Sequence, residues 1–184
     1  MKGAESSQIL ADCKRLRRLV ALPARGIPLD REHEYVSAFE RARQEALSGR
    51  HEEALREADA LQKTFPGTPG AAVIACLVDG RQKPPGVARK ACESARSAAP
   101  EAFLPRYVLG LLRFAEGRIA EARAELESAL DLEDSTTSAW SSLAAVYEKL
   151  GDQASAKDLA ARYRARFGSD LQPALWPAGW PHSK

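Results

Sequence analysis

The sequence predicts an all-α fold, built as a tandem array of helical hairpins. Two observations support this prediction. Alanine, leucine, arginine and glutamate, which are good helix formers, dominate the composition, while β-branched residues are sparse. The 184-residue chain also repeats at a fixed step, and small or apolar residues recur in the same phase of each copy. We therefore expect one continuous array.

The repeat has a period of 34 residues and is visible in several independent columns. Glycines follow helical segments at Gly49, Gly117 and Gly151, one or two periods apart, and Pro66 and Pro100 keep the same step. Because alanine is abundant, one alanine column would be weak evidence, but several columns in a common phase are not explained by abundance. The aligned small residues are Ala54, Ala88, Ala122 and Ala156 in one column and Ala42, Cys76, Gly110 and Ala144 in another.

These columns resemble the tetratricopeptide repeat, whose pattern runs from a tryptophan through Leu-Gly and a tyrosine to a turn glycine, an alanine and a closing proline. The copy most similar to it contains Trp140, Leu143, Ala144, Tyr147, Gly151 and Ala156. The resemblance implies a right-handed α-α superhelix of about four helix-turn-helix units. Their expected boundaries are 35–68, 69–102, 103–136 and 137–170.

Each unit is expected to be two antiparallel helices whose apolar stripes are buried only when neighbouring units stack. The turn glycines adopt a left-handed backbone at little cost, and the small residues let the paired helices approach closely. The second unit departs from the pattern at Lys83-Pro84-Pro85-Gly86. Since proline stops a helix and restricts the residue before it, we expect a longer or kinked loop there.

Residues 1–34 are interpreted as an N-terminal helix and its connector. Over residues 5–22, one face carries Ile9, Cys13, Leu16 and Val20, which favours an amphipathic cap over the open end of the array. A basic helix for an acidic partner or a membrane surface is the alternative. Asp30 is expected to cap the helix that follows it. The hydroxyl-rich segment 134–138 is likewise expected to cap a helix at that place.

The tail, residues 171–184, contains Trp176-Pro177-Ala178-Gly179-Trp180-Pro181 and cannot continue a helix. Two tryptophans exposed on a short tail would be unfavourable. We expect them to dock on the protein's own surface; a partner-binding motif is the alternative.

Charge and chemistry exclude several functions. With 27 Lys plus Arg against 25 Asp plus Glu, the net charge of +2 gives no reason to expect a nucleic-acid partner. No apolar run approaches the roughly 18 residues of a membrane span. We find no catalytic set, no metal site and no cofactor motif. The histidines are His33, His51 and His182, and they are expected on a solvated surface.

The cysteines Cys13, Cys76 and Cys92 are odd in number and widely spaced, which argues against a disulfide framework. They fit a reducing compartment, so a cytoplasmic location is predicted. Cys76 and Cys92 occupy small-residue columns and are expected to pack as buried thiols.

In tetratricopeptide arrays the first helix of each unit lines a concave face, and the resemblance implies a partner-binding groove there. By column its residues are Phe39, Arg43, Val73, Leu77, Tyr107, Leu111 and Phe114, with Ser141, Ala145 and Glu148 in the fourth unit and Trp176 and Trp180 contributed by the tail. The matching columns lack the Lys, Asn and Arg clamp that seizes a C-terminal carboxylate.

An apolar groove instead suits a hydrophobic peptide or an amphipathic helix of another protein. The function expected is therefore that of a non-enzymatic interaction scaffold or adaptor. A secretion-type chaperone for a hydrophobic client and a non-catalytic subunit of an enzyme complex are the alternatives. A homodimer also stays open, because an apolar face can serve as a dimer surface.

Overall fold

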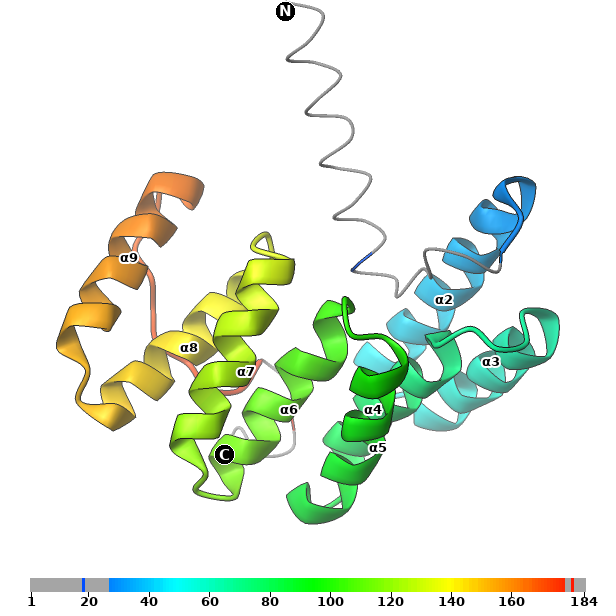
Figure 1. The fold of residues 1–184 in the computed structure, drawn as a ribbon, viewed down its shortest axis with the longest axis horizontal. Coiled ribbons are helices and arrows are strands. Elements are labelled where there is room, and N and C mark those ends of the chain that lie inside the picture. Colours follow the sequence, from blue (N-terminus) through cyan, green and yellow to red (C-terminus); the bar gives the residue numbers. More distant parts are fainter. Residues whose placement is uncertain (1–17, 19–26, 178–179, 181–184) are drawn as a thin grey trace, which may run out of the picture.

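The computed structural model describes Arg18, residues 27–177 and Trp180, and the described residues form helices and no strand. The predicted all-α class is confirmed. After a short 3₁₀ helix, η1 (Leu29–Arg31), the helices follow one another along the molecule (Figure 1). They are α2 (Glu32–Leu47), α3 (His51–Thr64), α4 (Gly70–Gln82), α5 (Pro85–Ala98), α6 (Phe103–Ala115), α7 (Ile119–Leu132), α8 (Thr137–Leu150) and α9 (Gln153–Phe167).

The helices pair in order, and the pairs repeat along the chain. α2 with α3, α4 with α5, α6 with α7 and α8 with α9 are the four hairpins. The last three lie within the predicted units 69–102, 103–136 and 137–170, whereas α2 begins three residues before the predicted unit 35–68. The first helices contact one another in a row, α2 on α4, α4 on α6 and α6 on α8. Each second helix packs against the first helix of the next hairpin. The core therefore runs continuously between two layers of helices.

Turn glycines have the backbone conformation that the repeat predicted. Gly49, Gly117 and Gly151 have φ angles of 84°, 76° and 70°, in the left-handed region that favours glycine. Gly110 is needed for a different reason, because a Cβ there would lie 2.6 Å from Leu126 Cγ. The close approach of α6 and α7 thus depends on a residue without a side chain.

The connection between α4 and α5 is shorter than we expected. α4 ends at Gln82 and α5 begins at Pro85, so only Lys83 and Pro84 join them. Of the longer or kinked loop that we expected, the longer one is therefore wrong. Lys83 and Pro84 are extended, with ψ angles of 156° and 144°. Pro85 then occupies the first turn of α5, where the missing N–H is not needed for a helical hydrogen bond. Two prolines therefore end one helix and begin the next.

The predicted helix caps are wrong at two places. Asp30 lies inside η1, and the N-cap of α2 is Arg31, which makes no side-chain cap bond. Thr136 precedes α8 without donating or accepting a cap bond, while the carboxylate of Glu133 accepts from Ser135 N at 2.7 Å. That carboxylate takes the place of a capping hydroxyl in satisfying an amide of this connection.

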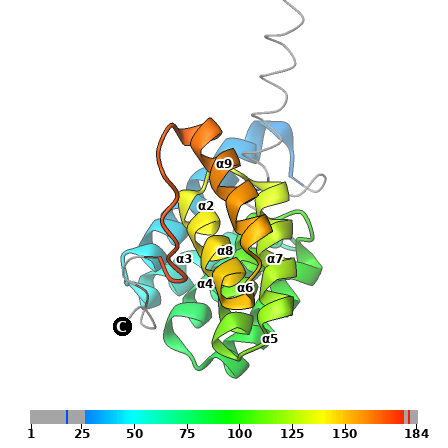
Figure 2. The same ribbon diagram turned by 90° about the vertical axis from the view of Figure 1, so that its left-hand side faces the viewer.

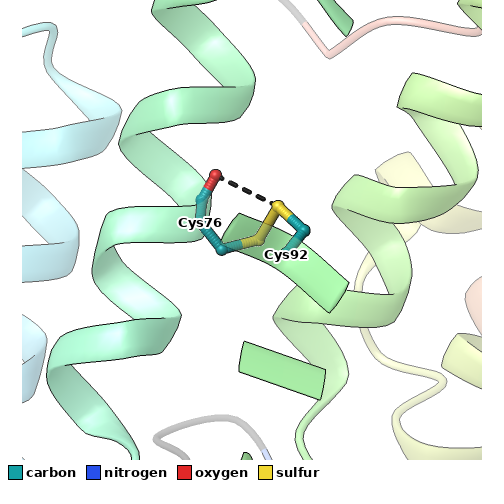
Figure 3. The surroundings of a disulfide bond; sticks show 2 residues. All are labelled: Cys76 and Cys92. Carbon is teal, nitrogen blue, oxygen red and sulfur yellow. Dashed lines mark hydrogen bonds between the residues drawn. A yellow bond between two sulfur atoms is a disulfide. The ribbon is translucent and has the colours of Figure 1, made fainter. Parts of the chain in front are cut away.

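Cys76 of α4 and Cys92 of α5 form a disulfide (Figure 3). Both residues are fully buried, as predicted, but they are not free thiols, and the argument against a disulfide is wrong. The two positions are 16 residues apart and face each other across one hairpin, with 4.6 Å between their Cα atoms. The odd cysteine count obscured the pair. Cys13 and the rest of the predicted N-terminal helix lie outside the described residues, apart from Arg18, which is helical and donates to Leu132 O at 3.2 Å.

Candidate partner-binding face

The tail folds back along the array. After α9 ends at Phe167, the chain descends beside α8 toward the first half of the molecule (Figure 2). Among its described residues, 171–177 and 180, Ala174 and Leu175 bond to α8 and Trp180 lies against α4. We call this surface the tail face. It is defined by Gly80 and Arg81 of α4, by Ser141 and Ser142 of α8, and by Val108 of α6, which lies next to Gly80.

Backbone hydrogen bonds hold the first part of the tail on α8. Ala174 N donates to Ser141 O at 3.1 Å, and Ser142 Oγ lies 2.6 Å from Leu175 O. Ser142 is fully buried, and Ser138 O, 2.9 Å away, competes for its single proton. These bonds involve main-chain atoms of the tail, so they fix an extended backbone and do not select its side chains.

Tyr107 lies beneath this contact. Its hydroxyl is 3.5 Å from Ser142 Oγ, close enough for a weak hydrogen bond. Burial raises the pKa of Tyr107, so the hydroxyl keeps its proton and can donate it to Ser142. Ser142 is then free to donate to Leu175 O. Hydrogen-bond donation can therefore run in one order, from Tyr107 of α6 to Ser142 of α8 and from Ser142 to Leu175 O of the tail.

The tryptophans of the tail stack on each other and one of them is buried. Their ring centroids are 5.7 Å apart with an interplanar angle of 26°. Trp180 is only 3% exposed, whereas Trp176 is half-buried. The predicted docking of the tail on the protein's own surface is therefore observed for the described part of the tail.

Gly80 lies next to both α6 and the indole of Trp180. A Cβ on Gly80 would lie 2.6 Å from Val108 Cγ1, which is too close, and 3.6 Å from Trp180 Cη2, which is an ordinary van der Waals distance. The missing side chain is therefore needed for the close approach of α4 and α6, and Trp180 packs beside that contact. Trp180 N also donates to Pro177 O at 3.2 Å.

Arg81 also lies against the indole of Trp180. Its guanidinium carbon lies 5.4 Å from the ring centroid of Trp180, within the range of a cation–π interaction. Its Nη2 donates to Leu47 O at 3.3 Å, at the C-terminal end of α2. Burial lowers the pKa of Arg81, and burial together with the Arg81 charge lowers the pKa of His51. One side chain therefore connects the tail to the first hairpin.

Most of the residues predicted to line an apolar groove are buried inside the array. Phe39, Val73, Leu77, Tyr107 and Leu111 are at most 5% exposed. Phe114 is half-buried, and Arg43 forms a bidentate ion pair with Glu40. Of the predicted set, Trp176 and Trp180 belong to the tail itself, and Tyr107 reaches it through Ser142. Their role in binding a partner stays a prediction.

A cavity lies beside the docked tail. It has a volume of about 260 Å³ and is lined by residues of α8 and α9 and by the tail, including Ser138, Tyr163, Asp170 and Trp176. A second cavity of about 320 Å³ lies between α2 and α3, where His33, Arg41 and Glu57 are among the lining residues. The first is continuous with the tail face, because Ser141 belongs to both.

A buried carboxylate is the main charged feature that the sequence did not predict. Glu125 of α7 is 4% exposed and pairs with Arg96 of α5 and with Arg106 and Arg113 of α6. Arg113 occupied the tyrosine column of the third unit, and this departure was the available signal. Because the carboxylate is fully paired, the cluster joins two hairpins and offers no free acid or base.

Other chemistry is sparse in the described part of the chain. Within Arg18, residues 27–177 and Trp180, no group of three His, Cys, Asp or Glu side chains could hold a metal ion. His33 is exposed, His51 is half-buried, and His182 lies outside the described residues. None of the described helices is both long and apolar enough to cross a bilayer.

Comparison with known proteins adds no family. No protein-family model matches the chain, and no curated protein matches it. The class is therefore defined by the structure alone, as an all-α array of helical hairpins with its own C-terminal segment bound across one face.

Proposed function

We propose that the chain is an interaction scaffold of the tetratricopeptide type, a right-handed superhelix of four units that binds an extended segment of another protein on the tail face. The observation that carries the proposal is the tail itself, which lies on this face as a peptide ligand would. It is held by main-chain hydrogen bonds at Ser141 and Ser142 and by a buried indole at Gly80 and Arg81.

The repeat supports the class of scaffold. Hairpins recur at a step of 34 residues, turn glycines have positive φ angles, and small residues lie where paired helices meet. Such arrays use one face built from their first helices to bind peptides. The described tail contacts α4 and α8, each the first helix of its hairpin.

Photo-crosslinking in the native cell tests the proposal. Benzoylphenylalanine at Ser141 samples the tail face, and the same residue at Leu55, 41% exposed on α3, is the matched control. We expect a protein crosslinked from position 141 and absent from position 55. The purified partner should then bind the chain in a calorimeter, and its affinity should fall for a Ser141→Trp variant that blocks the face. Equal labelling from both positions would contradict the proposal.

The cellular location stays a prediction. Disulfides persist mainly in oxidising compartments, so the bond between Cys76 and Cys92 removes the support that the cysteines gave to a cytoplasmic location. Alkylation of thiols at the moment of lysis, followed by mass spectrometry, distinguishes the two cases. Alkylated Cys76 and Cys92 would support the cytoplasm, and a blocked pair would argue against it.

A further inference from the structure

The tail binds its own array in a way that defines the chemistry of an external ligand. This step rests on the proposed function, because it concerns what the tail face binds. Trp180 is 3% exposed, and its indole lies against Gly80 and Arg81, with Val108 on the other side of Gly80. The hydrogen bonds of the described tail to α8 are made by main-chain atoms of the tail, and Leu171, Leu175 and Trp176 pack against the core while only partly buried. The indole of Trp180 is the most deeply buried side chain of the described tail, so we infer that selectivity depends mainly on it.

We propose that Gly80, Arg81 and Val108 form a tryptophan-binding pocket that the tail occupies as a tethered competitor. Its external ligand is a segment of a partner protein that is extended and presents a tryptophan, with a second aromatic residue four positions before it. Trp176 fills that second position in the tail, where it stacks on Trp180. Such a segment displaces residues 171–184 and takes over their contacts.

Two features of the pocket favour an indole. Residue 80 has no side chain, and a Cβ position there lies 3.6 Å from Trp180 Cη2, so the ring lies close to the backbone of α4. The guanidinium of Arg81 faces the ring, and cations interact most strongly with tryptophan among the aromatic side chains. A leucine would fill less of the space and would not attract the cation.

The tether determines how strongly the tail competes. A segment joined by a short flexible linker acts at an effective concentration on the order of a millimolar. The linker here runs from Gly168 through the exposed Ser169 and Asp170. If the same peptide binds with a Kd of about 10 µM when free, the tether weakens its apparent affinity roughly a hundredfold. A variant whose tail no longer docks should therefore regain this loss of apparent affinity.

The test uses full-length chains and a fluorescent synthetic peptide with the sequence of residues 171–184. In the opened variant Trp176→Ala/Trp180→Ala, the tail loses both rings while the pocket keeps its own residues. We expect the peptide to bind this variant at least tenfold more tightly than it binds the wild-type chain. A peptide carrying the Trp180→Ala change should lose at least tenfold in affinity. A peptide carrying Gln172→Ala, at an exposed position, should bind as well as the parent.

A second measurement keeps the proposal testable if the opened variant fails to fold. Wild-type protein labelled with 5-fluorotryptophan is titrated with excess unlabelled peptide, and the resonance of Trp180 is followed by fluorine NMR. Displacement should move this resonance toward its position in the unfolded chain. No shift at millimolar peptide, or equal binding of the parent and Trp180→Ala peptides, would overturn the pocket.

The outcomes also separate this inference from the proposed function. A partner that crosslinks at position 141 but binds without any tryptophan would support the scaffold function and contradict the tryptophan-binding pocket. Tryptophan-dependent peptide binding without a cellular partner would contradict the scaffold function. A wild-type dimer at the assay concentration, dissolved by the peptide, would show that a second copy supplies the tail and would overturn the external ligand.

Discussion

Glu125 is surrounded by three arginines in the interface between the second and third hairpins. It is nearly inaccessible, whereas Arg96 and Arg106 are about one-third and one-quarter exposed. Removing one member of such a buried pair leaves the other charges without compensation. The side chain thus holds α5, α6 and α7 together through charge, where the rest of the core uses apolar contact.

We expect Glu125→Ala to lower the free energy of unfolding by about 3 kcal/mol, at the low end for a buried pair because the arginines keep partial access to water. Urea denaturation followed by circular dichroism measures the change. Glu148→Ala, at an exposed position of α8, is the control and should alter stability by less than about 0.5 kcal/mol. Equal effects of the two substitutions would show that the cluster has no structural role.

Gly117 tests the turn between α6 and α7. Its φ angle is 76°, and nothing lies within 4 Å of a Cβ built there, so a substitution meets backbone strain and no collision. Gly117→Val should lower the free energy of unfolding by about 1–3 kcal/mol. Gly117→Asn should cost less, because asparagine tolerates the left-handed region. A valine variant as stable as the asparagine variant would contradict this explanation.

At the scale of elements, α9 is the described helix with a side-chain cap. Asp152 accepts from Ser155 N at 3.0 Å, and this bond, together with one from the Ser155 hydroxyl, lowers the pKa of Asp152. A lowered folded-state pKa stabilises the fold above the unfolded value, near 3.9, and this stability is lost as pH falls through the folded value.

Asp152→Asn separates the charge from the cap. Asparagine caps helices about as well as aspartate, so the variant should match the wild type near neutral pH. As the pH falls below about 4, the wild type should lose stability more steeply than the variant. Thermal unfolding between pH 2.5 and 7 measures both curves. Parallel curves would show that the Asp152 carboxylate does not contribute through its charge.

The disulfide joins the two helices of the second hairpin, whose turn has no glycine. In the chain-entropy description, closing a loop of this size stabilises a fold by about 3 kcal/mol. Cys76→Ala/Cys92→Ala should therefore lower the urea midpoint, and wild-type protein reduced while unfolded should do the same. Because both cysteines are fully buried, dithiothreitol should reduce the native protein only slowly. An unchanged midpoint after reduction would argue against a structural role.

The elements were predictable to the extent that the signal was local. Gly49, Gly117 and Gly151 marked the turns because positive φ favours glycine in any protein. The Cys76–Cys92 bond and the short Lys83–Pro84 connection were missed because both depend on how two helices face each other. At the candidate site, docking of Trp176 and Trp180 followed from their cost in water. Gly80 and Arg81 were missed because the tail reaches them only in the folded chain.

At the scale of the whole molecule, the tail changes how the hairpins depend on one another. An array of repeats is held by contacts between neighbours, so its ends can unfold separately. Here the segment after α9 reaches α4, two hairpins away, and bonds to α8 on its path. The second and fourth hairpins are therefore linked by the tail as well as by the shared core.

We expect Trp180→Ala to weaken this coupling. Amide hydrogen exchange in α8 and α9 should become faster relative to α4 and α5, because the last hairpin loses its connection to the second. Mass spectrometry of peptides from each helix measures the change. Leu150→Ala, at an exposed position of α8, is the control. A uniform change in all helices would indicate a general loss of stability and would contradict the specific coupling.

The folded-back end of the chain also affects how such a protein should be handled in the laboratory. Trp180 is buried on the tail face, so an affinity handle or fluorescent reporter joined shortly after it would interfere with that contact. A bulky fusion at that place would displace the tail or cover the tail face. Screens that use such fusions would then describe an altered protein, and labels in α3 or α5 are the safer choice.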